Sequence, residues 1–599
     1  MEILKRSEVP VEYTWDLTHI FAAEEDWQRE YEALGKIGSR YEALKGKLGE
    51  SAEKLLEYFR LEDEVSVRLS ALYSYASCHN DEDTADAHYV DLKSKATRTY
   101  VSVSSVSSFA VPEIQNIPEE KLASFTAKLP ALHEYDRAVF LIRRKNEHTL
   151  SPENEQLLAS AGEMAEAPGE INSVLLNADI RFPDVTDSSG TPHRLTGGTL
   201  VPCLESPDRS FREKAFRTYY KGLGQFRHTI AAALDGQFKQ LRFFAEARHY
   251  RSTLEASLFV HEVPGEVYHN LIDAVHQNLE PMYRYVALRK KLLGVDELHM
   301  YDVYTPIVGE ADAVIPFEQA KSTVLEALAV LGPDYLEMLR EGFDNRWIDV
   351  YENEGKRGGA YSTDVSRPHP YVLLNYKDNL DSMFTLAHEM GHSLHSCLST
   401  KNQPVSTSDY VIFVAEVAST VNEILLMRYL LGKTGDKKQR AYLINHFMDQ
   451  FKATLYRQTM FAEFEREMGR MSEAGEALTA DALCAKYLEL NKLYFGPDMV
   501  SDEEIGLEWA RIPHFFYNYY VFQYATSFAA AAAISGQILE QGAPAVKAYK
   551  QFLSGGCSAD PISLLKIAGV DMSTPEPVHQ ALRLFSGLVA EMEDLCSGQ

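Results

Sequence analysis

The chain has 599 residues, which is longer than one typical domain of about 100 to 200 residues, so we expect more than one domain or lobe. With 45% hydrophobic and 24% charged residues it has the composition of an ordinary globular protein, which excludes disordered and fibrous classes. Its 87 acidic residues exceed the 59 Lys and Arg, and the formal net charge of -28 disfavours nucleic acid as a partner because phosphate backbones are also anionic.

From residue 24 to about residue 166 the sequence predicts successive amphipathic helices, because hydrophobic residues recur near helical spacing. A small hairpin is predicted over residues 180–195, where two short apolar pieces flank a Ser-Ser-Gly turn. Helical periodicity resumes from Asp208 and dominates the rest of the chain. The sequence therefore predicts a mainly α fold, with an N-terminal helical lobe over residues 1–200 and a second helical domain over residues 201–599.

A second irregular stretch covers residues 343–379 and includes Gly355, Gly358 and Gly359, followed by the apolar run 371–374. This pattern predicts a small β-sheet with flexible connections directly before the next helix. We expect Gly358 and Gly359 to let the nearby loop close over a bound ligand.

The segment 381–396 predicts a helix that carries a metal-binding pattern, with Asn379 or Asp381 as its cap. His388 and His392 are four residues apart, so both imidazoles project from one face and can bind a single zinc ion. Glu389 then lies beside the metal, where a carboxylate can act as a general base toward water. A chance match to this pattern is expected on the order of 0.05 times in such a chain. The domain over residues 201–599 is therefore predicted to be catalytic.

Catalytic zinc normally has three protein ligands and one open position, so one ligand remains to be found. The sequence has Leu398 where the metzincin extension requires His, which excludes that arrangement. His395 is interpreted as a second-shell or substrate-side group in preference to a ligand. In the next predicted helix, Glu416 stands among apolar residues, where an unpaired carboxylate is costly to bury, so we predict Glu416 as the third ligand.

Glu423 lies seven residues beyond Glu416 and returns to nearly the same face of that helix. It can therefore accept a hydrogen bond from a ligating histidine and fix the orientation of the ring. The alternative is that Glu423 faces solvent on an amphipathic helix.

HEMGH at 388–392, followed by FVAEVASTVNE at 413–423, resembles the thimet oligopeptidase-like family of zinc metallopeptidases, in which the Glu of the second segment is the third ligand. Three further segments are similar to the start, the glycine-rich loop and the end of the oligoendopeptidase branch of that family: EYTWDLTHIF at 12–21, GKRGGAY at 355–361 and DPISLLKIAGVDM at 560–572. The resemblance covers essentially the whole chain. It implies a two-lobed helical bowl enclosing a deep channel, with a small β-sheet next to the active-site helix, and cleavage of short, unfolded peptides.

The resemblance also implies that a His and Tyr residues of the segment 511–524 stabilise the oxyanion formed during peptide hydrolysis. The histidine corresponds to His514. The tyrosines correspond to Tyr517, Tyr520 and Tyr524, because the segment can be aligned with the family in more than one register. The alternative is that the aromatic residues pack a helix core, which we expect for Phe515, Phe516 and at least one Tyr.

Two groups near the predicted sheet are assigned to the substrate side. The strand 371–375 is expected to offer a free backbone edge to which an extended peptide can add, although a plain structural hairpin is an alternative. Tyr361, together with Gly358 and Gly359, is predicted as a further residue of the substrate-binding region.

The sequence therefore predicts a zinc-dependent oligoendopeptidase that hydrolyses short peptides with Glu389 as general base. A carboxypeptidase-like exopeptidase is the first alternative, and it requires a cationic group such as Arg357 or Arg511 to bind the terminal carboxylate. A non-catalytic helical scaffold stabilised by zinc is the second. Manganese or cobalt can also support a His/His/Glu site, since such ligands discriminate weakly among these metals.

The location of the protein is predicted from its cysteines and its amino terminus. The six cysteines are dispersed and form no CxxC pair, and the start of the chain lacks the apolar stretch of a secretory signal. No apolar run of about 18 residues is present, so a membrane span is not expected. These features favour a reducing, cytoplasmic location, and they carry no prediction of oligomeric state.

Overall fold

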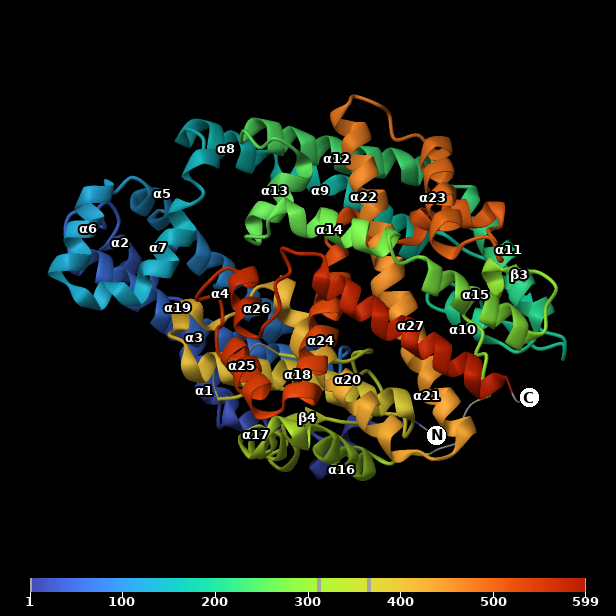
Figure 1. Cartoon of the computed structure of the whole chain (residues 1–599). Coiled ribbons are helices and arrows are strands. Elements are labelled where there is room, and N and C mark those ends of the chain that lie inside the picture. The colour runs from blue at the N-terminus through green and yellow to red at the C-terminus, as the bar shows by residue number, and fades with distance from the viewer. Residues whose placement is uncertain (1–2, 310–313, 364–367, 598–599) are drawn as a thin grey trace. The chain divides into compact units, whose positions relative to one another are not determined.

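The computed structural model describes residues 3–309, 314–363 and 368–597, and helices make up most of it (Figure 1). The prediction of a mainly α fold is confirmed. The chain forms two compact units, each built from three separate segments. The first unit comprises Met1–Glu147, Ala313–Leu426 and Ile534–Gly569, and the second comprises His148–Asp312, Met427–Ala533 and Val570–Gln599.

These units differ from the predicted division at residue 200, which separated two consecutive segments. A division into consecutive segments uses only the order of elements along the chain, whereas a compact unit is defined by which elements pack together. The boundary near residue 200 and the channel between two lobes stay predictions.

The helices of the first unit are α1 Glu24–Leu34, α2 Gly38–Glu42, α3 Ala52–Glu82, α4 Ala87–Ser107, α5 Ala110–Gln115, α6 Glu119–Lys128, α7 Asp136–Arg143, α16 Phe317–Ala327, α17 Pro333–Asp344, α18 Leu380–Asn402, α19 Val405–Ser408, α25 Ala543–Leu553 and α26 Pro561–Ile567. Two helices, α20 Ile412–Lys433 and α24 Phe522–Gln541, continue from one unit into the other.

The helices of the second unit are α8 Pro152–Ser160, α9 Gly162–Val174, α10 Leu200–Glu205, α11 Arg209–Gly224, α12 Arg227–Ala247, α13 Thr253–Val260, α14 Gly265–His276, α15 Glu280–Leu293, α21 Lys437–Gln450, α22 Arg457–Glu473, α23 Ala480–Phe495 and α27 Glu576–Cys596. Its strands form two small pairs: β1 Val185–Thr186 with β2 Pro192–His193, and β3 Leu298–His299 with β7 Met499–Val500. The first pair is antiparallel and confirms the hairpin predicted over residues 180–195.

A three-stranded sheet lies directly before α18 in the sequence and confirms the small sheet predicted within residues 343–379, of which residues 364–367 lie outside the described part. Its strands are β4 Ile348–Asp349, β5 Tyr361–Ser362 and β6 Val372–Leu373, in the order β4-β6-β5. β6 is parallel to β4 and antiparallel to β5. The prediction that the strand at 371–375 offers a free edge is wrong, because both sides of β6 are already paired. Among the described residues the free edge belongs to β5. The outer side of the β4 segment is occupied, because the N–H of Val350 donates to the carbonyl oxygen of Tyr13 at 2.9 Å and the N–H of Asp16 donates to that of Arg346 at 2.8 Å.

The sheet is held between a hydrophobic core and the helix α18. Buried residues from α1 to α7, among them Trp27 and Leu55, form one core with Tyr371 and Leu373 of the β6 segment. On the other side, α18 contacts both β5 and β6. Burial of apolar side chains on both sides therefore fixes the position of α18 relative to the sheet.

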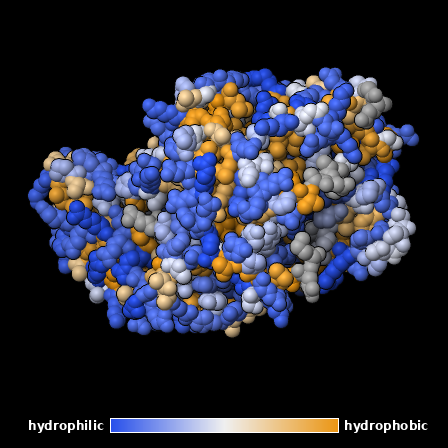
Figure 2. Space-filling view, turned by 90° about the horizontal axis from the view of Figure 1, so that it is seen from below, coloured by the Kyte–Doolittle hydropathy of each residue, from blue (hydrophilic) through white to orange (hydrophobic). Residues whose placement is uncertain are grey.

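Hydrophilic side chains cover most of the face shown in Figure 2, and hydrophobic residues appear between them. This agrees with the large excess of acidic residues in the sequence. Within the described part of the chain, every helix is too short or too polar to cross a membrane.

Candidate metal centre

The helix α18 presents two histidines on one face. It begins after Asn379, whose side chain accepts a hydrogen bond from the backbone N–H of Ser382 at 2.9 Å, so the predicted cap is confirmed. Because α-helical residues four apart lie one above the other, His388 and His392 bring their Nε2 atoms to 3.2 Å.

The helix α20 adds a carboxylate to this pair. Oε2 of Glu416 lies 3.3 Å from Nε2 of His388 and 3.4 Å from Nε2 of His392. Burial alone would raise the pKa of Glu416, but hydrogen bonds from the two histidines lower it well below its usual range. The structure thus brings together the three residues predicted as ligands, and each offers one donor atom within 4.8 Å of the others.

The spacing of these atoms fits a tetrahedral metal ion. Ligand atoms about 2.0 to 2.1 Å from a tetrahedral zinc ion lie about 3.3 to 3.4 Å from one another. The three observed separations, 3.2, 3.3 and 3.4 Å, match that value. Two imidazoles and one carboxylate are also the donor set found in catalytic zinc sites, so the residues present fit a zinc ion.

Glu423 is hydrogen-bonded to His388, in the arrangement considered from the sequence. Its Oε1 contacts Nδ1 of His388, which directs Nε2 toward Glu416. Burial alone would lower the pKa of His388, but the carboxylates of Glu416 and Glu423 raise it well above its usual range. The alternative of a solvent-facing Glu423 is wrong, since its side chain is only 17% exposed.

Glu389 lies next to the metal-binding group without belonging to it. Its side chain is buried, with the residue 7% exposed. The donor atoms available to a metal ion come from His388, His392 and Glu416 instead. Burial raises the pKa of its carboxyl group above the usual value. A buried carboxylate outside the ligand set is a suitable proton acceptor and donor.

Two residues that sequence reasoning missed hold α18 and α20 at the required separation. A Cβ atom at Gly391 would lie only 2.6 Å from Cα of Ser419 in α20, so only glycine allows this approach. Asn422 of α20 donates its side-chain N–H to the carbonyl oxygen of Ala387 at 3.0 Å and accepts from the hydroxyl of Tyr335 at 3.0 Å. The polar Asn422 within an apolar helix was a usable sequence signal, as Glu416 was.

His395 is separate from the metal-binding group. It is 1% exposed and stacks on Tyr410 with ring centroids 3.7 Å apart, while the ring of Phe552 lies 5.6 Å away. Burial lowers its pKa to about 3, so the ring is neutral at ordinary pH. Its contacts are those of a core residue, which gives no support to a substrate-side role.

The glycine-rich segment lies at the sheet edge. Gly358 and Gly359 have open space around their Cα atoms, and the backbone at Gly359 has a positive φ of 85°. The carbonyl oxygen of Gly359 accepts a hydrogen bond from Asn375 at 2.8 Å. Tyr361 of β5 points its hydroxyl at Asp81 of α3, 2.8 Å away, so this hydroxyl is already engaged.

In the second unit, the predicted His and Tyr residues form one aromatic cluster. The ring of His514 lies 5.4 Å from that of Tyr517 and 6.2 Å from those of Tyr520 and Tyr524. Burial lowers the pKa of His514. Phe515 is buried, as expected for a core aromatic residue, and so is a neighbouring tyrosine.

That buried tyrosine belongs to a strained turn within the cluster. Asn518 and Tyr519 have φ values of 57° and 59°, a region that residues other than glycine seldom adopt. The N–H of Tyr519 donates to Glu465 at 3.1 Å, and Gln237 donates to the side chain of Asn518 at 2.9 Å. These contacts hold the turn that precedes Tyr520, and strain of this kind is common at functional sites.

The two arginines considered for an exopeptidase are both ion-paired. Arg511 is bound to Glu508 at 2.6 Å, and its side chain is 13% exposed. Arg357 lies 3.2 Å from Asp81. Neither guanidinium is therefore an uncommitted cation.

Comparison with known proteins gives matches over nearly the whole chain. Residues 203–584 match the model of peptidase family M3, and residues 113–182 match the model named oligopeptidase F. The oligopeptidase PepF of Bacillus subtilis is 46% identical over 590 residues, which cover 98% of this chain and 88% of that protein.

Solved structures give the same result. Oligoendopeptidase-F of Enterococcus faecium is 37% identical, with a TM-score of 0.76 over 96% of this chain and 100% of that chain. A crystal structure from Chlamydophila abortus is 33% identical, with a TM-score of 0.92 over 99% of this chain and 100% of that chain.

Proposed function

We propose, because the chain belongs to peptidase family M3, that its donor cluster binds one zinc ion and that the enzyme cleaves short, unstructured peptides internally. The chain is a metallo-oligopeptidase: its relatives over nearly the full length are oligopeptidases, and the fold is shared. The single observation that carries the proposal is the convergence of the three donor atoms of His388, His392 and Glu416 at 3.2 to 3.4 Å.

Zinc bound by these residues would act as a Lewis acid that polarises the peptide carbonyl and makes water more acidic. Glu389, buried beside the site and outside the ligand set, takes a proton from the attacking water. The same carboxyl group then returns the proton to the nitrogen of the departing amine. Glu423 acts as a positioning residue, because its contact with Nδ1 of His388 fixes the tautomer of that ring.

We further propose that the aromatic cluster of the second unit supplies hydrogen-bond donors to the developing oxyanion. Support comes from the grouping of His514 with three tyrosines and from the strained turn that holds them. Tyr517 is 55% exposed, so its hydroxyl is accessible to a ligand.

An extended peptide is proposed to pair with the free edge of β5. This strand contacts α18, and the hydroxyl of Ser362 lies 2.8 Å from that of Ser393, the residue after His392. Main-chain hydrogen bonds along such an edge do not depend on side-chain identity, so they suit an enzyme that accepts varied peptides. We therefore assign to β5 the peptide-pairing role that was predicted for the strand at 371–375.

Neither alternative function is favoured by an observation. An exopeptidase needs an uncommitted cation, and the guanidinium groups of Arg357 and Arg511 are both paired with carboxylates. Structural zinc sites are closed by four protein ligands, whereas the described residues offer three and place Glu389 beside them.

The variant Glu389→Gln tests the assignment of the general base. We expect it to retain zinc, measured by metal analysis after dialysis, while kcat falls by about two to four orders of magnitude. His388→Ala should lose both zinc and activity. Asp381→Asn, an exposed change on the same helix, is the matched control and should keep both. Full turnover by Glu389→Gln would refute the mechanism.

Product analysis by mass spectrometry tests the mode of cleavage. With an internally quenched peptide of ordinary oligopeptide length, we expect internal cuts, whereas stepwise loss of terminal residues would support the exopeptidase. A folded protein offered at the same concentration should remain intact, and equal rates on both substrates would contradict restriction to short peptides.

A cytoplasmic location is proposed on the basis of the cysteines. None of the six forms a disulfide in the structure, and burial raises the pKa of Cys78 well above its usual value. Cysteines without disulfides are typical of proteins in reducing compartments.

A further inference from the structure

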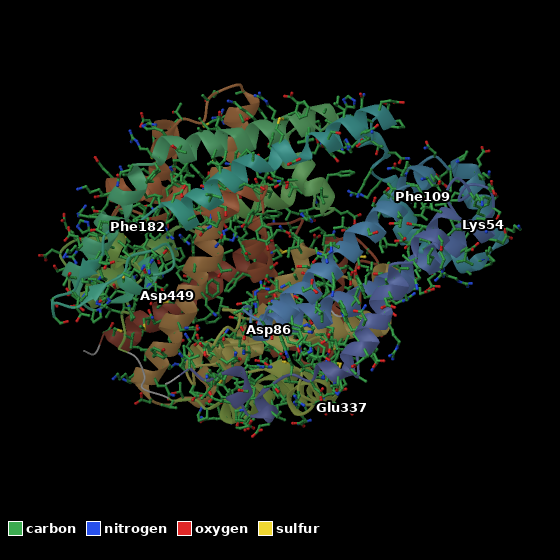
Figure 3. All side chains as sticks on the ribbon, turned by 180° about the vertical axis from the view of Figure 1, so that it is seen from behind. Lys54, Asp86, Phe109, Phe182, Glu337 and Asp449 are labelled. Carbon is green, nitrogen blue, oxygen red and sulfur yellow. The ribbon has the colours of Figure 1, made fainter. Side chains whose placement is uncertain are left out.

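One side of the helix α22 supports the segment that carries the aromatic cluster. Asp449, labelled in Figure 3, lies one residue before the end of α21, and the helical rod continues from there through residues 451–456 into α22. Contacts with the segment 508–519 come from Arg457, Phe461, Phe464, Glu465 and Gly469. At about 100° per residue these positions fall within an arc of about 140° around α22, and we call them the α22 stripe.

Ion pairs hold the start of the segment on this stripe. Oε1 of Glu508 accepts a hydrogen bond from Arg457 of α22 at 2.6 Å and another from Arg511 at 2.6 Å. The carboxylate side chain is only 4% exposed. A buried carboxylate of this kind is stable only with its cations in place, so the segment is fixed relative to α22 at this point.

An aromatic side chain holds the middle of the segment. The ring of Phe515 lies 5.4 Å from that of Phe461 and 5.3 Å from that of Phe464, and Phe515 is 1% exposed. Burial between two rings of α22 therefore fixes the backbone next to His514, the histidine of the aromatic cluster.

The side chain of Tyr519 fits against the bare backbone of α22. A Cβ atom at Gly469 would overlap the hydroxyl oxygen of Tyr519, so only glycine allows this approach. Tyr519 is 2% exposed, and its ring makes edge contacts with Phe238 of α12 and Tyr268 of α14, with centroids 6.1 and 6.2 Å away. The phenol therefore occupies a slot formed by three helices.

A chain of hydrogen bonds holds the phenol in this slot. The hydroxyl of Thr253 donates to Oε1 of Glu473 at 2.8 Å and lies 2.7 Å from the hydroxyl of Tyr519. Because Thr253 has one hydroxyl proton, the hydroxyl of Tyr519 is the donor in the second bond. Thr253 is 3% exposed, so water has little access to this contact.

Glu465 holds the backbone of the same residue. Its Oε1 accepts the N–H of Tyr519 at 3.1 Å, and the residue is 0% exposed, while Oε2 has no hydrogen-bond partner among the described residues. Burial raises the pKa of Glu465 well above its usual value, so its carboxyl group is neutral at ordinary pH. An apolar residue would avoid the cost of burying this group, but it could not accept the N–H of Tyr519.

These anchors determine the path of the chain through the aromatic cluster. The positive φ values of Asn518 and Tyr519 redirect the backbone between Tyr517 and Tyr520, whose rings lie 6.3 Å apart. Without the anchors, Asn518 and Tyr519 would return to the negative φ values that such residues prefer. The rings on either side of the turn would then move apart.

We propose that Tyr519 and Glu465 are positioning residues for peptide hydrolysis: by fixing the strained turn on the α22 stripe, they place the hydrogen-bond donors of the aromatic cluster at the developing oxyanion. Both residues are buried and act through their neighbours. The inference rests on the proposed function, since it requires that the cluster stabilises the oxyanion. The oxyanion exists only in the transition state and the intermediate, so loss of an anchor should lower kcat and leave KM unchanged.

Tyr519→Phe tests the anchor by removing the hydroxyl group while keeping the ring. In the full-length, metal-loaded enzyme we expect kcat to fall about tenfold, because small displacements of catalytic groups lower the rate strongly. Thr253→Val removes the other partner of the same contact, so it should give the same loss, and the double variant should be no worse than either single variant. Tyr494→Phe is the matched control, since this tyrosine is 1% exposed and donates to Glu463 of α22 at 2.8 Å, outside the stripe. The control should keep the wild-type kcat.

Conservative replacement tests the role of Glu465. Glu465→Gln keeps an oxygen that accepts the N–H of Tyr519, so kcat should stay close to the wild-type value. Glu465→Met has a similar length but no such acceptor, and its kcat should fall about 10- to 100-fold. Gly469→Ala, which displaces the phenol of Tyr519, should also lose kcat while it retains the metal, in contrast to a variant that disturbs the metal-binding group.

A peptide with a phosphinate group in place of the cleaved bond separates positioning from general loss of structure. This group is tetrahedral and anionic, so it resembles the intermediate formed during hydrolysis. Its inhibition constant should rise in Tyr519→Phe and Glu465→Met by the same factor by which kcat falls, measured well below each melting temperature. A lower kcat with an unchanged inhibition constant would overturn the inference.

Variants of the proposed donors separate failure of this inference from failure of the proposed function. Unchanged kcat in the Phe variants of Tyr517, Tyr520 and Tyr524 would refute the oxyanion role itself. Loss of kcat in one of those variants, together with wild-type kcat in Tyr519→Phe and Glu465→Met, would overturn the positioning role alone. Equal losses in Glu465→Gln and Glu465→Met would overturn the part assigned to Glu465.

Discussion

Gly391→Ala is the perturbation that tests most directly how the metal site is built. A methyl group at this position would lie 2.6 Å from Cα of Ser419, 2.8 Å from the carbonyl oxygen of Ala418 and 2.9 Å from the N atom of Ser419. These are backbone atoms, so no side chain can turn away to relieve the contact. Since ordinary contact begins at 3.4 Å, α20 must move away from α18 by about 3.4 − 2.6 = 0.8 Å.

This displacement moves Glu416, which lies one helical turn before Ser419. Its Oε2 is now 3.3 and 3.4 Å from the two histidine nitrogens. Metal–ligand distances tolerate about 0.2 Å, so a shift of about 0.8 Å removes the carboxylate from a shared ion. We expect the zinc affinity to fall at least about 10- to 100-fold.

Stability alone would give a weaker test. Overpacking costs about 1 to 3 kcal/mol, but replacing a helical glycine by alanine recovers about 1 kcal/mol of helix propensity. The two effects partly cancel in the free energy of unfolding. The gain in helix propensity does not reverse the displacement of Glu416.

Zinc affinity should therefore be measured by competition with a chelator of known affinity, together with the melting temperature of the zinc-free protein. Gly536→Ala is the matched control, because this glycine is also within a helix and has open space around it. The control should keep its zinc affinity and gain slightly in stability. Wild-type zinc affinity in Gly391→Ala would show that the close approach of α18 and α20 does not determine the site.

Three further predictions concern other parts of the molecule. Asn422→Ala removes the hydrogen bonds to the carbonyl oxygen of Ala387 and to the buried hydroxyl of Tyr335, so the free energy of unfolding measured in urea should fall by about 1 to 3 kcal/mol, and no loss would contradict a positioning role. Burial would raise the pKa of Glu508, but two buried arginines lower it to about 2, below its usual value of 4.5. Its stabilisation is therefore present above pH 4.5 and is lost as the pH falls toward 2, so Glu508→Gln should show a flatter acid limb of melting temperature against pH than the wild type. Replacement of one oxyanion donor by Phe should lower kcat about 10²- to 10³-fold with little change in KM, and unchanged kcat in all three single variants would refute the proposed role of Tyr517, Tyr520 and Tyr524.

Much of the metal site follows from local sequence. The spacing of His388 and His392 needs only an α-helix to place both rings on one face, and the observed helix does so. Glu416 was predicted because a carboxylate within an apolar helix requires a partner, and the structure supplies two histidines. In both cases a short-range rule of geometry or solvation was sufficient.

Other features depend on contacts between distant segments. The sequence predicts a free backbone edge for the strand at 371–375, yet β4 and β5 pair with both sides of β6. Tyr361 was assigned to the substrate side, but its hydroxyl donates to Asp81, a residue 280 positions away in the chain. His395 has the spacing of a possible ligand, but packing with Tyr410 places it in the core. Periodicity along one segment carries no information about such partners.

The sequence by itself therefore determined the helical class, the donor cluster of two histidines and Glu416, and the family resemblance, because these depend on spacing, burial and local motif. Only the tertiary structure decided which strand has a free edge and why position 391 must be glycine. These properties arise when helices and strands from distant parts of the chain pack together, and side-chain packing at that scale is set by three-dimensional complementarity.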